Sequence, residues 1–416
     1  MRYETFIGLR YLKSRGGLLF SVGGVALGIA TVVVVLSVMN GWESVIRDKM
    51  LRSEGHIFVY GGSRSFINYQ MVMEDIEEIE GVVATSPVLM RRAAIMDRSG
   101  DNQAGGMIKA VVPELQSKVT SIDDFISEGL SFDSSLIHEA RENTEESISG
   151  GIILGKGVAD NLRVGRGDIV RLIPRLVEVA GSTHAVVRNF VVVDIYNSGM
   201  YSYDSVFTFI SLEAGQELFA LGDNSFERDS VDRIEVRIED IHKAEKIAET
   251  IQGEMGLQFL TMTWMEAHED LFQAIKMEKL VTFIIEALII FVATFNIAST
   301  LIMMVMAKTK EIGILKSMGA TKRNIWFIFT FEGTLIGFLG AILGTLLGLL
   351  LCWSLRTWLP IPIDNSVYQI SRLPAEISWP FVALVNAASV VLCWLATLYP
   401  AWRASRLRPV EALRHE

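Results

Sequence analysis

The stretch LLFSVGGVALGIATVVVVLSVM, residues 18–39, contains no charged side chain and follows four basic residues. A membrane-spanning helix needs roughly 20 consecutive apolar residues, so this stretch is long enough to cross a bilayer. It is also longer than the apolar core of a secretory signal, which has about 7 to 15 residues, and no clear cleavage site of small residues ends it. The sequence therefore predicts a retained transmembrane helix at 18–40.

Three further apolar windows predict transmembrane helices at 279–307, 325–351 and 379–400. The window at 279–307 contains Glu286, and the window at 325–351 contains Glu332. A hydrophobic content of 50% agrees with a chain that lies partly in lipid. Carboxylates inside membrane helices are candidates for function. Both of these also lie near helix ends, where lipid headgroups or water can reach them, and their role stays open.

Basic residues near the helix ends predict the orientation of the chain, because short cytoplasmic loops retain Lys and Arg. The first sixteen residues carry four basic side chains, the 308–324 segment five and the 401–416 tail four. The short 352–378 loop carries two. We therefore expect residues 1–17, 308–324 and 401–416 in the cytoplasm, and residues 41–278 and 352–378 on the opposite side of the membrane.

The long 41–278 segment is predicted to be a separate acidic domain. Its charged residues sum to −18 and those of the rest of the chain to +8, which together give −10. Apolar runs that alternate with amphipathic stretches predict mixed strands and helices, hence an α+β domain between the first two membrane helices. Both cysteines, Cys352 and Cys393, lie outside this segment, so it has to hold together without disulfides.

The stretch GGIILGKG, residues 150–157, matches the first seven positions of a phosphate-binding P-loop. Gly157 stands where a Ser or Thr hydroxyl would bind magnesium, and the preceding RENTEESIS is polar and acidic. The residues that follow predict a strand, a helix, a Gly-rich turn and a second strand instead. No other P-loop pattern occurs in the sequence, so we expect this chain not to be an ATPase, or any other enzyme, by itself.

The segment KTKEIGILKSMGATKRNIWFIF predicts a short amphipathic helix on the cytoplasmic side of the membrane. Ile312, Leu315 and Met318 recur at helical spacing, Gly319 is suited to end this helix, and Thr321 is suited to cap the next one. Such a helix could rest on lipid headgroups, form part of a bare basic loop or contact a partner protein. The residues alone leave these alternatives open.

Two further patterns bear on how the helices connect and pack. From Trp264 a helical pattern runs into the second membrane helix without Gly or Pro, which predicts one continuous helix. The third membrane helix carries a ridge of small residues, which allows helices to approach closely. The ridge consists of Gly333, Gly337, Gly340, Gly344 and Gly348.

Stretches spread over nearly the whole chain resemble one group of membrane proteins. KEIGILKSMGATKRNI and YPAWRASRLRPVEALR are similar to the coupling-helix segment and the C-terminus of the MacB and FtsX superfamily of ABC transporter permeases. FIGLRYLKSR, GVALGIATVVVVLSVMNGWE, IILGKGVADNLRVGRGD, YNSGMYSYDSVFTFISLEAGQELF and VYQISRLPAEI resemble the lipoprotein-releasing permeases, the LolC/LolE family. The resemblance implies an α-helical membrane protein with four transmembrane helices and a large MacB-like α+β periplasmic domain inserted between helices 1 and 2.

The resemblance also implies a function. Two permeases, either two copies of this chain or this chain and a relative, would work with two copies of a cytoplasmic LolD-like ATPase. That ATPase would bind ATP and Mg²⁺, whereas this chain would bind no cofactor. The complex would sit in the inner membrane of a Gram-negative bacterium, with both termini cytoplasmic and the large domain periplasmic. It would extract acylated lipoproteins from the outer leaflet of the inner membrane and pass them to a LolA-like periplasmic carrier.

The resemblance places two sets of residues in contact with partners. The set expected in the ATPase groove is Glu311, Ile312, Leu315, Lys316, Gly319 and Ala320. A carrier-binding loop of one family permease corresponds to IPRLVEVAGSTHAVVR, residues 173–188, although its amino acids differ from those expected of such a loop. The carrier-contact candidates are Pro174, Arg175 and Arg188. A plain hairpin between two strands is the alternative.

An extracted lipid chain needs an apolar cavity, because each buried CH₂ group contributes about 0.8 kcal/mol to membrane binding. Such a cavity has to open sideways to the leaflet. The candidate lining, near the outer ends of the first two membrane helices, is Val34, Val35, Val38, Met39, Phe283, Ile284, Ala287 and Leu288. Lipid-facing surface and ordinary helix packing are the alternatives for each of them.

Two other functions fit the superfamily pattern. An FtsX-type permease would transmit a signal across the membrane, and a MacB-type permease would export small molecules with an ATPase fused to its N-terminus. The short stretch before the first helix leads us to expect no such fusion. The six histidines are scattered and form no i, i+4 pair, so no metal site is predicted. The acidic domain disfavours nucleic acid as a partner.

Overall fold

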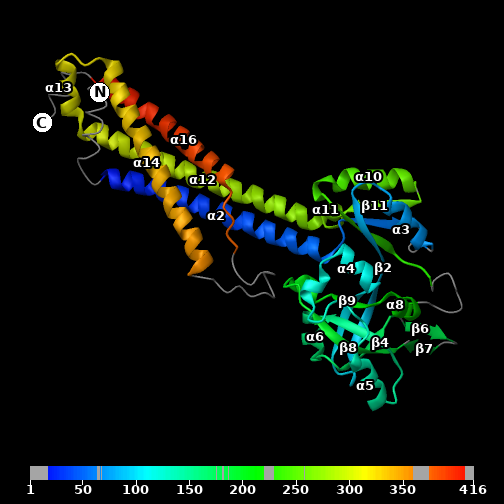
Figure 1. Ribbon diagram of the computed structural model, residues 1–416. Coiled ribbons are helices and arrows are strands. Elements are labelled where there is room, and N and C mark those ends of the chain that lie inside the picture. The colour runs from blue at the N-terminus through cyan, green and yellow to red at the C-terminus, as the bar shows by residue number, and fades with distance from the viewer. Residues whose placement is uncertain are drawn as a thin grey trace. The chain divides into compact units, whose positions relative to one another are not determined.

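The computed structural model describes residues 17–62, 66, 68–174, 176–179, 182–185, 187–219, 229–256, 258–358 and 374–407. These residues form two compact units. The helical unit lies within 17–45, 273–358 and 374–407, and the strand unit lies within 46–272. Figure 1 shows both units, and each is described by itself below.

The helical unit is built from four long helices and one short helix. They are α2 (Gly17–Ser53), α12 (Glu269–Ala307), α13 (Thr309–Ser317), α14 (Lys322–Thr357) and α16 (Trp379–Arg406), of which α2 and α12 extend into the strand unit. Within the described residues, Ser21–Ser53, Lys322–Thr357 and Trp379–Arg406 are long and apolar enough to cross a membrane. The predicted crossing at 279–307 coincides with α12 and stays a prediction.

Small residues on α14 let the helices approach closely, as the sequence predicts. A Cβ atom built on Gly337 would lie 2.5 Å from Cβ of Cys393 on α16, and one on Gly344 would lie 2.6 Å from the carbonyl oxygen of Ala26 on α2. Figure 1 shows α14 and α16 running side by side. Residues three and four apart lie on one face of a helix, so these glycines form one ridge, in which Gly337 meets α16 and Gly344, further along, meets α2.

The strand unit contains eleven described strands. Nine form one sheet, in the order β11-β1-β10-β2-β3-β9-β4-β8-β5. The strands are β1 (Ile57–Gly61), β2 (Val82–Asp97), β3 (Gln103–Val111), β4 (Ile148–Gly155), β5 (Ile169–Ile173), β6 (Leu176–Val179), β7 (Ser182–Ala185), β8 (Arg188–Tyr196), β9 (Phe207–Ser211), β10 (Arg233–Ile238) and β11 (Phe259–Thr263). The short helices are α3 (Tyr69–Glu77), α4 (Pro113–Val119), η1 (Ile122–Phe125), α5 (Ser135–Asn143), α6 (Lys156–Leu162), α7 (Tyr201–Asp204), α8 (Leu212–Phe219), η2 (Ile241–Lys243), α10 (Ala244–Met255) and α11 (Trp264–Ala267).

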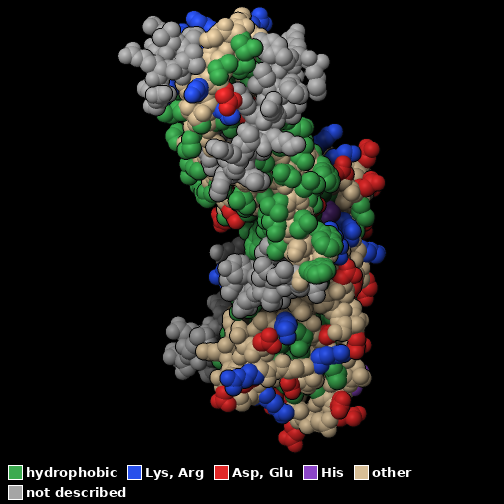
Figure 2. Space-filling model, turned by 90° about the vertical axis from the view of Figure 1, so that its left-hand side faces the viewer, with side chains coloured by type: hydrophobic (Ala, Val, Ile, Leu, Met, Phe, Trp, Pro, Cys, Tyr) green, Lys and Arg blue, Asp and Glu red, His purple; other side chains and the backbone are tan. Residues whose placement is uncertain are grey.

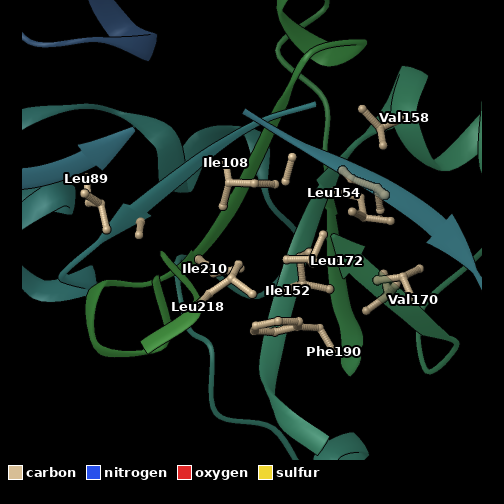
Figure 3. Close-up of a cluster of buried hydrophobic side chains, with 14 of the residues drawn as sticks. Leu89, Ile108, Ile152, Leu154, Val158, Val170, Leu172, Phe190, Ile210 and Leu218 are labelled. Carbon is tan, nitrogen blue, oxygen red and sulfur yellow. The ribbon is translucent and has the colours of Figure 1, made fainter. Parts of the chain in front are cut away.

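Six of the nine strands close into a barrel. The long strand β2 pairs with β3 on one side and returns to pair with β5, which completes the ring β2-β3-β9-β4-β8-β5. Figure 3 shows the barrel interior, where Ile152, Leu172, Phe190 and Ile210 come from four different strands and point toward one another. All four side chains are fully buried. The sequence predicts the α+β class of this unit but not the closure.

The remaining strands, β10, β1 and β11, extend the sheet beyond β2. One face of this extension packs against α3 and α10 through a second apolar cluster, which includes Ile57, Ile76, Ile234 and Ile251. Figure 1 shows α3 and α10 beside these strands. The hydrophobic effect thus holds the strand unit together in two places, one inside the barrel and one under the two helices.

The edge strand β11 has its outward N–H groups occupied. The N–H of Thr261 donates to Oε1 of Gln252 at 2.9 Å, and the N–H of Thr263 donates to Oε2 of Glu266 at 2.8 Å. The N–H of Phe259 donates to the carbonyl oxygen of Gly256 at 3.3 Å. Thr263 and Glu266 also form a capping box, which starts the one-turn helix α11.

The predicted continuous helix from Trp264 is interrupted. Helix α11 ends at Ala267, and α12 begins at Glu269, because the backbone of His268 is not helical at φ −119° and ψ 34°. The periodicity of the side chains continues through this position, so the pattern alone did not show the break. The side chain of His268 instead bonds to Glu54, which immediately follows α2.

Candidate functional site

The predicted coupling segment forms a helix and a turn between α12 and α14. Helix α13 ends at Ser317, and Gly319 adopts a positive φ of 99°, which an L-residue with a side chain rarely takes. The side chain of Thr321 then accepts a hydrogen bond from the N–H of Asn324 and caps α14. The sequence predictions for Gly319 and Thr321 are confirmed.

Three of the six residues expected in an ATPase groove pack into an apolar cluster of their own chain. Ile312 is only 1% exposed and packs in an apolar cluster with Ile325 of α14 and Ala401 of α16. Leu315 and Ala320 pack partly buried against the same cluster. These contacts fix how α13 lies against α14 and α16. The assignment of these three residues to a partner contact stays untested.

Lys316 holds α13 to the end of α16. Its Nζ donates to the carbonyl oxygens of Ser405 and Leu407, at 2.6 Å each. A cation placed at these carbonyls also interacts favourably with the negative end of the helix dipole. Lys316 is therefore a positioning residue of the coupling segment.

The exposed face of the coupling segment carries two apolar residues that are absent from the set expected in the ATPase groove. Ile314 is 46% exposed and Met318 is 80% exposed, and Glu311 and Gly319 are exposed beside them. Ile314 and Met318 are four residues apart, so they share one side of the segment. The sequence signal for this exposed face was an apolar residue opposite the buried Ile312. A helix that packs only against its own chain is expected to be polar on its outer side.

The candidate cavity residues lie in two different environments. On α2, Val34, Val35, Val38 and Met39 are half-buried, whereas on α12 Phe283, Ile284, Ala287 and Leu288 are exposed. Figure 2 shows that hydrophobic side chains cover much of the visible surface of the long helices. An exposed apolar surface of this size on one chain indicates contact with lipid, cargo or another protein.

Two carboxylates lie inside the helical unit. Glu332 of α14 is fully buried, and neither of its carboxylate oxygens has a hydrogen-bond partner among the described residues. Glu286 of α12 is 7% exposed, and its Oε1 likewise lacks a partner there. A buried carboxyl group without a partner is costly if it is charged. The structure therefore strengthens the case for a role of Glu332, which the sequence left open.

The 173–188 stretch forms a separate two-stranded sheet between β5 and β8. Strands β6 and β7 pair antiparallel, with Leu176 opposite Ala185 and Val179 opposite Ser182. Of the three carrier-contact candidates, Pro174 is half-buried before β6 and Arg188 is exposed at the start of β8. Arg175 lies outside the described residues. A hairpin is present as the alternative expected, and its contact with a carrier stays untested.

The P-loop-like stretch has the secondary structure expected from its sequence. It comprises the end of β4 and the start of α6, and β5 follows after a turn. A Cβ atom on Gly157 would lie 2.8 Å from Cα of Ser205, so this glycine allows α6 to pack closely on the chain after α7. The side chain of Lys156 lies 3.7 Å from Asp160 on the same helix. Packing therefore accounts for the residues that resemble a phosphate site.

A cluster of charges is buried in the strand unit. The two carboxylate oxygens of Glu235 lie 2.8 and 3.0 Å from Nζ of Lys109, and Oε1 also lies 2.6 Å from Nη2 of Arg233. Nε2 of Gln116 donates to Oε2 of Glu235 at 2.9 Å. Burial alone would raise the pKa of Glu235, but the positive charges of Lys109 and Arg233 lower it. Glu235 is therefore ionised at neutral pH.

Two known protein families match this chain over most of its length. Residues 18–254 match the MacB-like periplasmic core domain, and residues 283–409 match the FtsX-like permease C-terminal family. The lipoprotein-releasing system transmembrane protein LolC of Neisseria meningitidis serogroup B is 30% identical, over 99% of this chain and 99% of that protein. The chain belongs to the LolC/LolE family.

Other members of the LolC/LolE family show the same extent of similarity. LolC of Xylella fastidiosa is 28% identical over 99% of this chain and 98% of its own length. LolE of Haemophilus influenzae is 26% identical over 95% of this chain and 93% of its own length. The resemblance expected from the quoted motifs is therefore confirmed, and it extends over both units.

Proposed function

We propose that this chain is the membrane-spanning permease subunit of an ABC transporter that releases lipoproteins from the inner membrane. The observation that carries the proposal is the similarity, over nearly the full length, to proteins named as lipoprotein-releasing system transmembrane proteins. The helices α2, α12, α14 and α16 would cross the inner membrane of a Gram-negative bacterium. The strand unit, inserted between the first two crossings, would then lie in the periplasm, and both termini would be cytoplasmic.

A separate LolD-like ATPase, which binds ATP and Mg²⁺, would contact the exposed side of the coupling segment. Ile314, Met318 and Gly319 are the residues available for this contact, with Glu311 beside them. The apolar cluster around Ile312 and the bonds of Lys316 would pass the motion of the ATPase to α14 and α16. Energy is required because an acylated protein does not leave the bilayer unaided.

The exposed apolar residues of α12 would line the path of the acyl chains, together with the half-buried residues of α2. A second permease, identical or related, would complete that path. The released lipoprotein would pass to a LolA-like periplasmic carrier, for which the β6–β7 hairpin and Arg188 are the candidate contact.

The test is ATP-dependent transfer of a triacylated lipoprotein from proteoliposomes to soluble carrier. The chain would be reconstituted with its ATPase, and Met318→Asp would be compared with Met71→Asp, which changes a 63% exposed methionine of the strand unit. We expect transfer by the wild type and by Met71→Asp. Met318→Asp should lose transfer and co-purification of the ATPase, because a charge is placed in an apolar contact.

ATP hydrolysis without any transfer, under conditions in which a known releasing complex works, would contradict the proposal. It would favour an FtsX-type signalling permease or a MacB-type efflux permease. Equal ATPase binding by Met318→Asp and Met71→Asp would instead contradict the placement of the contact at the coupling segment.

A further inference from the structure

The ends of two long helices meet at one hydrogen bond in the strand unit. Helix α2 ends at Ser53, and the next residue is Glu54. His268 immediately precedes α12. Nε2 of His268 lies 3.0 Å from Oε2 of Glu54, although the two residues are 214 positions apart in the sequence. Because an ionised carboxylate can only accept, His268 is the donor in this bond.

Glu54 is held from several sides. The side chain is 9% exposed, and the hydroxyl of Tyr203 donates to its other oxygen, Oε1, at 3.0 Å. Burial alone would raise the pKa of Glu54, but the hydrogen bond from His268 and the charges of Arg233 and Lys109 lower it to about 2. Glu54 is therefore the ionised end of α2 that enters the buried charge cluster.

Glu54 interacts electrostatically with that cluster, because the charges of Arg233 and Lys109 lower its pKa. Lys109 and Arg233 carry two positive charges, and Glu235 alone supplies only one negative charge. Glu54 supplies the second, so the four buried groups sum to zero. Buried ion pairs of this kind contribute little to stability compared with apolar residues of the same volume, and they are best attested as devices that fix one arrangement. The cluster thus fixes the position of Glu54 more than it strengthens the fold.

The end of α2 has further attachments in the strand unit. Nζ of Lys49 donates to the carbonyl oxygen of Gly199 at 2.7 Å, and the hydroxyl of Tyr196 donates to Oγ of Ser53 at 3.1 Å. Gly199 belongs to a turn held by Asp204, whose carboxylate accepts from the N–H groups of Ser198 and Gly199. The last turns of α2 are therefore bonded to the barrel strand β8 and to the loop that follows it.

The start of α12 is attached differently. Its polar link to the cluster is His268, which is 30% exposed on its side chain, so water can compete for Glu54. The apolar contact beside it is the edge-on packing of Phe272 against Trp264, with ring centres 5.2 Å apart. The break between α11 and α12 falls at His268 itself. The bond between His268 and Glu54 therefore joins the start of α12 to the well-attached end of α2.

We propose that His268 and Glu54 are positioning residues, which join the start of α12 and the end of α2 to the buried charge cluster so that the two helices move the strand unit together. This inference rests on the proposed function, in which motion driven by ATP has to reach the strand unit. It assigns a specific pair of residues to that step. All of these residues lie within the strand unit, so the link is internal to it.

The test compares His268→Leu, which removes the donor, with His268→Gln, which keeps one, and with His242→Leu as the matched control at an exposed histidine of the same unit. The readout is lipoprotein transferred per ATP hydrolysed in proteoliposomes. We expect His268→Leu to hydrolyse ATP at nearly the wild-type rate but to transfer about tenfold less per ATP, the size expected for losing a hydrogen bond to a charged group. His268→Gln should recover most of the transfer, and His242→Leu should match the wild type.

A second readout separates this inference from the proposed function. Amide hydrogen exchange of the full chain should be faster at residues 264–272 in His268→Leu than in the wild type or in His242→Leu, whatever the chain transports. If His268→Leu does not fold, Tyr203→Phe, which removes the other side-chain donor to Glu54, takes its place with a smaller expected effect. Equal transfer per ATP and equal exchange in His268→Leu and His242→Leu would overturn the proposal. Faster exchange in a chain that transfers no lipoprotein would overturn only the proposed function.

Discussion

The helical unit and the strand unit are held together by different means. In the helical unit, glycines of α14 bring helices so close that added Cβ atoms would meet Val25, Ala26 and Cys393. The strand unit contains two apolar clusters and a set of buried, paired charges. Lipid tails are as apolar as the side chains, so helices in a membrane are held by close fit, whereas a domain in water has a hydrophobic driving force and can bury charges beside its core. Close fit between helices therefore stabilises the helical unit, whereas the burial of apolar side chains stabilises the strand unit.

The largest effect should follow from breaking the buried charges. Glu235→Gln leaves Lys109 and Arg233 with one negative partner, Glu54, and an unpaired buried charge costs about 3–5 kcal/mol. We expect a large drop in the melting temperature of the strand unit, measured on the full chain in detergent. The control is Glu245→Gln on the exposed side of α10. Equal melting temperatures of the two variants would mean that water reaches the cluster. Buried charge would then not be a difference between the strand unit and the helical unit.

Acid should weaken the strand unit through Glu54. Its pKa in the folded chain is about 2, below the usual 4.5, so its contribution is fully present above about pH 5 and is lost as the pH falls through 2. The shift corresponds to about 3 kcal/mol. The gap in melting temperature between the wild type and Glu54→Gln should therefore narrow between pH 5 and pH 2. A gap that stays constant over this range would contradict the ionisation of Glu54.

A smaller effect is expected from spoiling the close fit of the helices. Gly344→Val places atoms against the backbone of Ala26 and against Ile29, and overpacking of this kind costs about 1–3 kcal/mol. Gly23→Val is the matched control, because no atom lies within 4 Å of a Cβ built there. The measurement is the fraction of the full chain that stays monodisperse on heating in detergent. If both valines behave alike, close fit at α14 does not hold the helical unit.

The helices were predictable because lipid imposes one simple rule on them. The predicted crossings at 18–40 and 325–351 lie within α2 and α14, and both helices are longer than the apolar windows. Residues 42–53 are polar enough to end the window, yet they contain no Gly or Pro, so α2 continues through them to Ser53. The apolar window thus predicts where a helix is buried in lipid, not where it ends.

The closure of the barrel and the charge cluster could not be predicted from the sequence, because both depend on contacts between distant residues. Closure depends on the pairing of Ala94 in β2 with Ile173 in β5, and the cluster depends on Lys109 and Glu235, which are 126 positions apart. Local periodicity contains no information on such contacts. A lysine inside a strand of apolar residues was the one available signal, because a buried charge requires a partner.

The coupling segment was predicted in part. Its helix, its glycine turn and its cap follow from local propensities, and these were correct. Which face of α13 packs inward depends on α16, whose end lies about 90 residues further along the chain. The family resemblance places Ile312 and Lys316 in contact with a partner, which stays a prediction; the structure shows that their side chains contact this chain.

The occupied edge of β11 has a consequence for how the strand unit meets other polypeptide chains. A bare strand edge is a template on which another extended chain can add itself, the first step of strand exchange and of fibre growth. Here Gln252, Glu266 and the carbonyl of Gly256 take the N–H groups that such a chain would need. Under the proposed function, these contacts keep β11 from pairing with an extended segment of a lipoprotein.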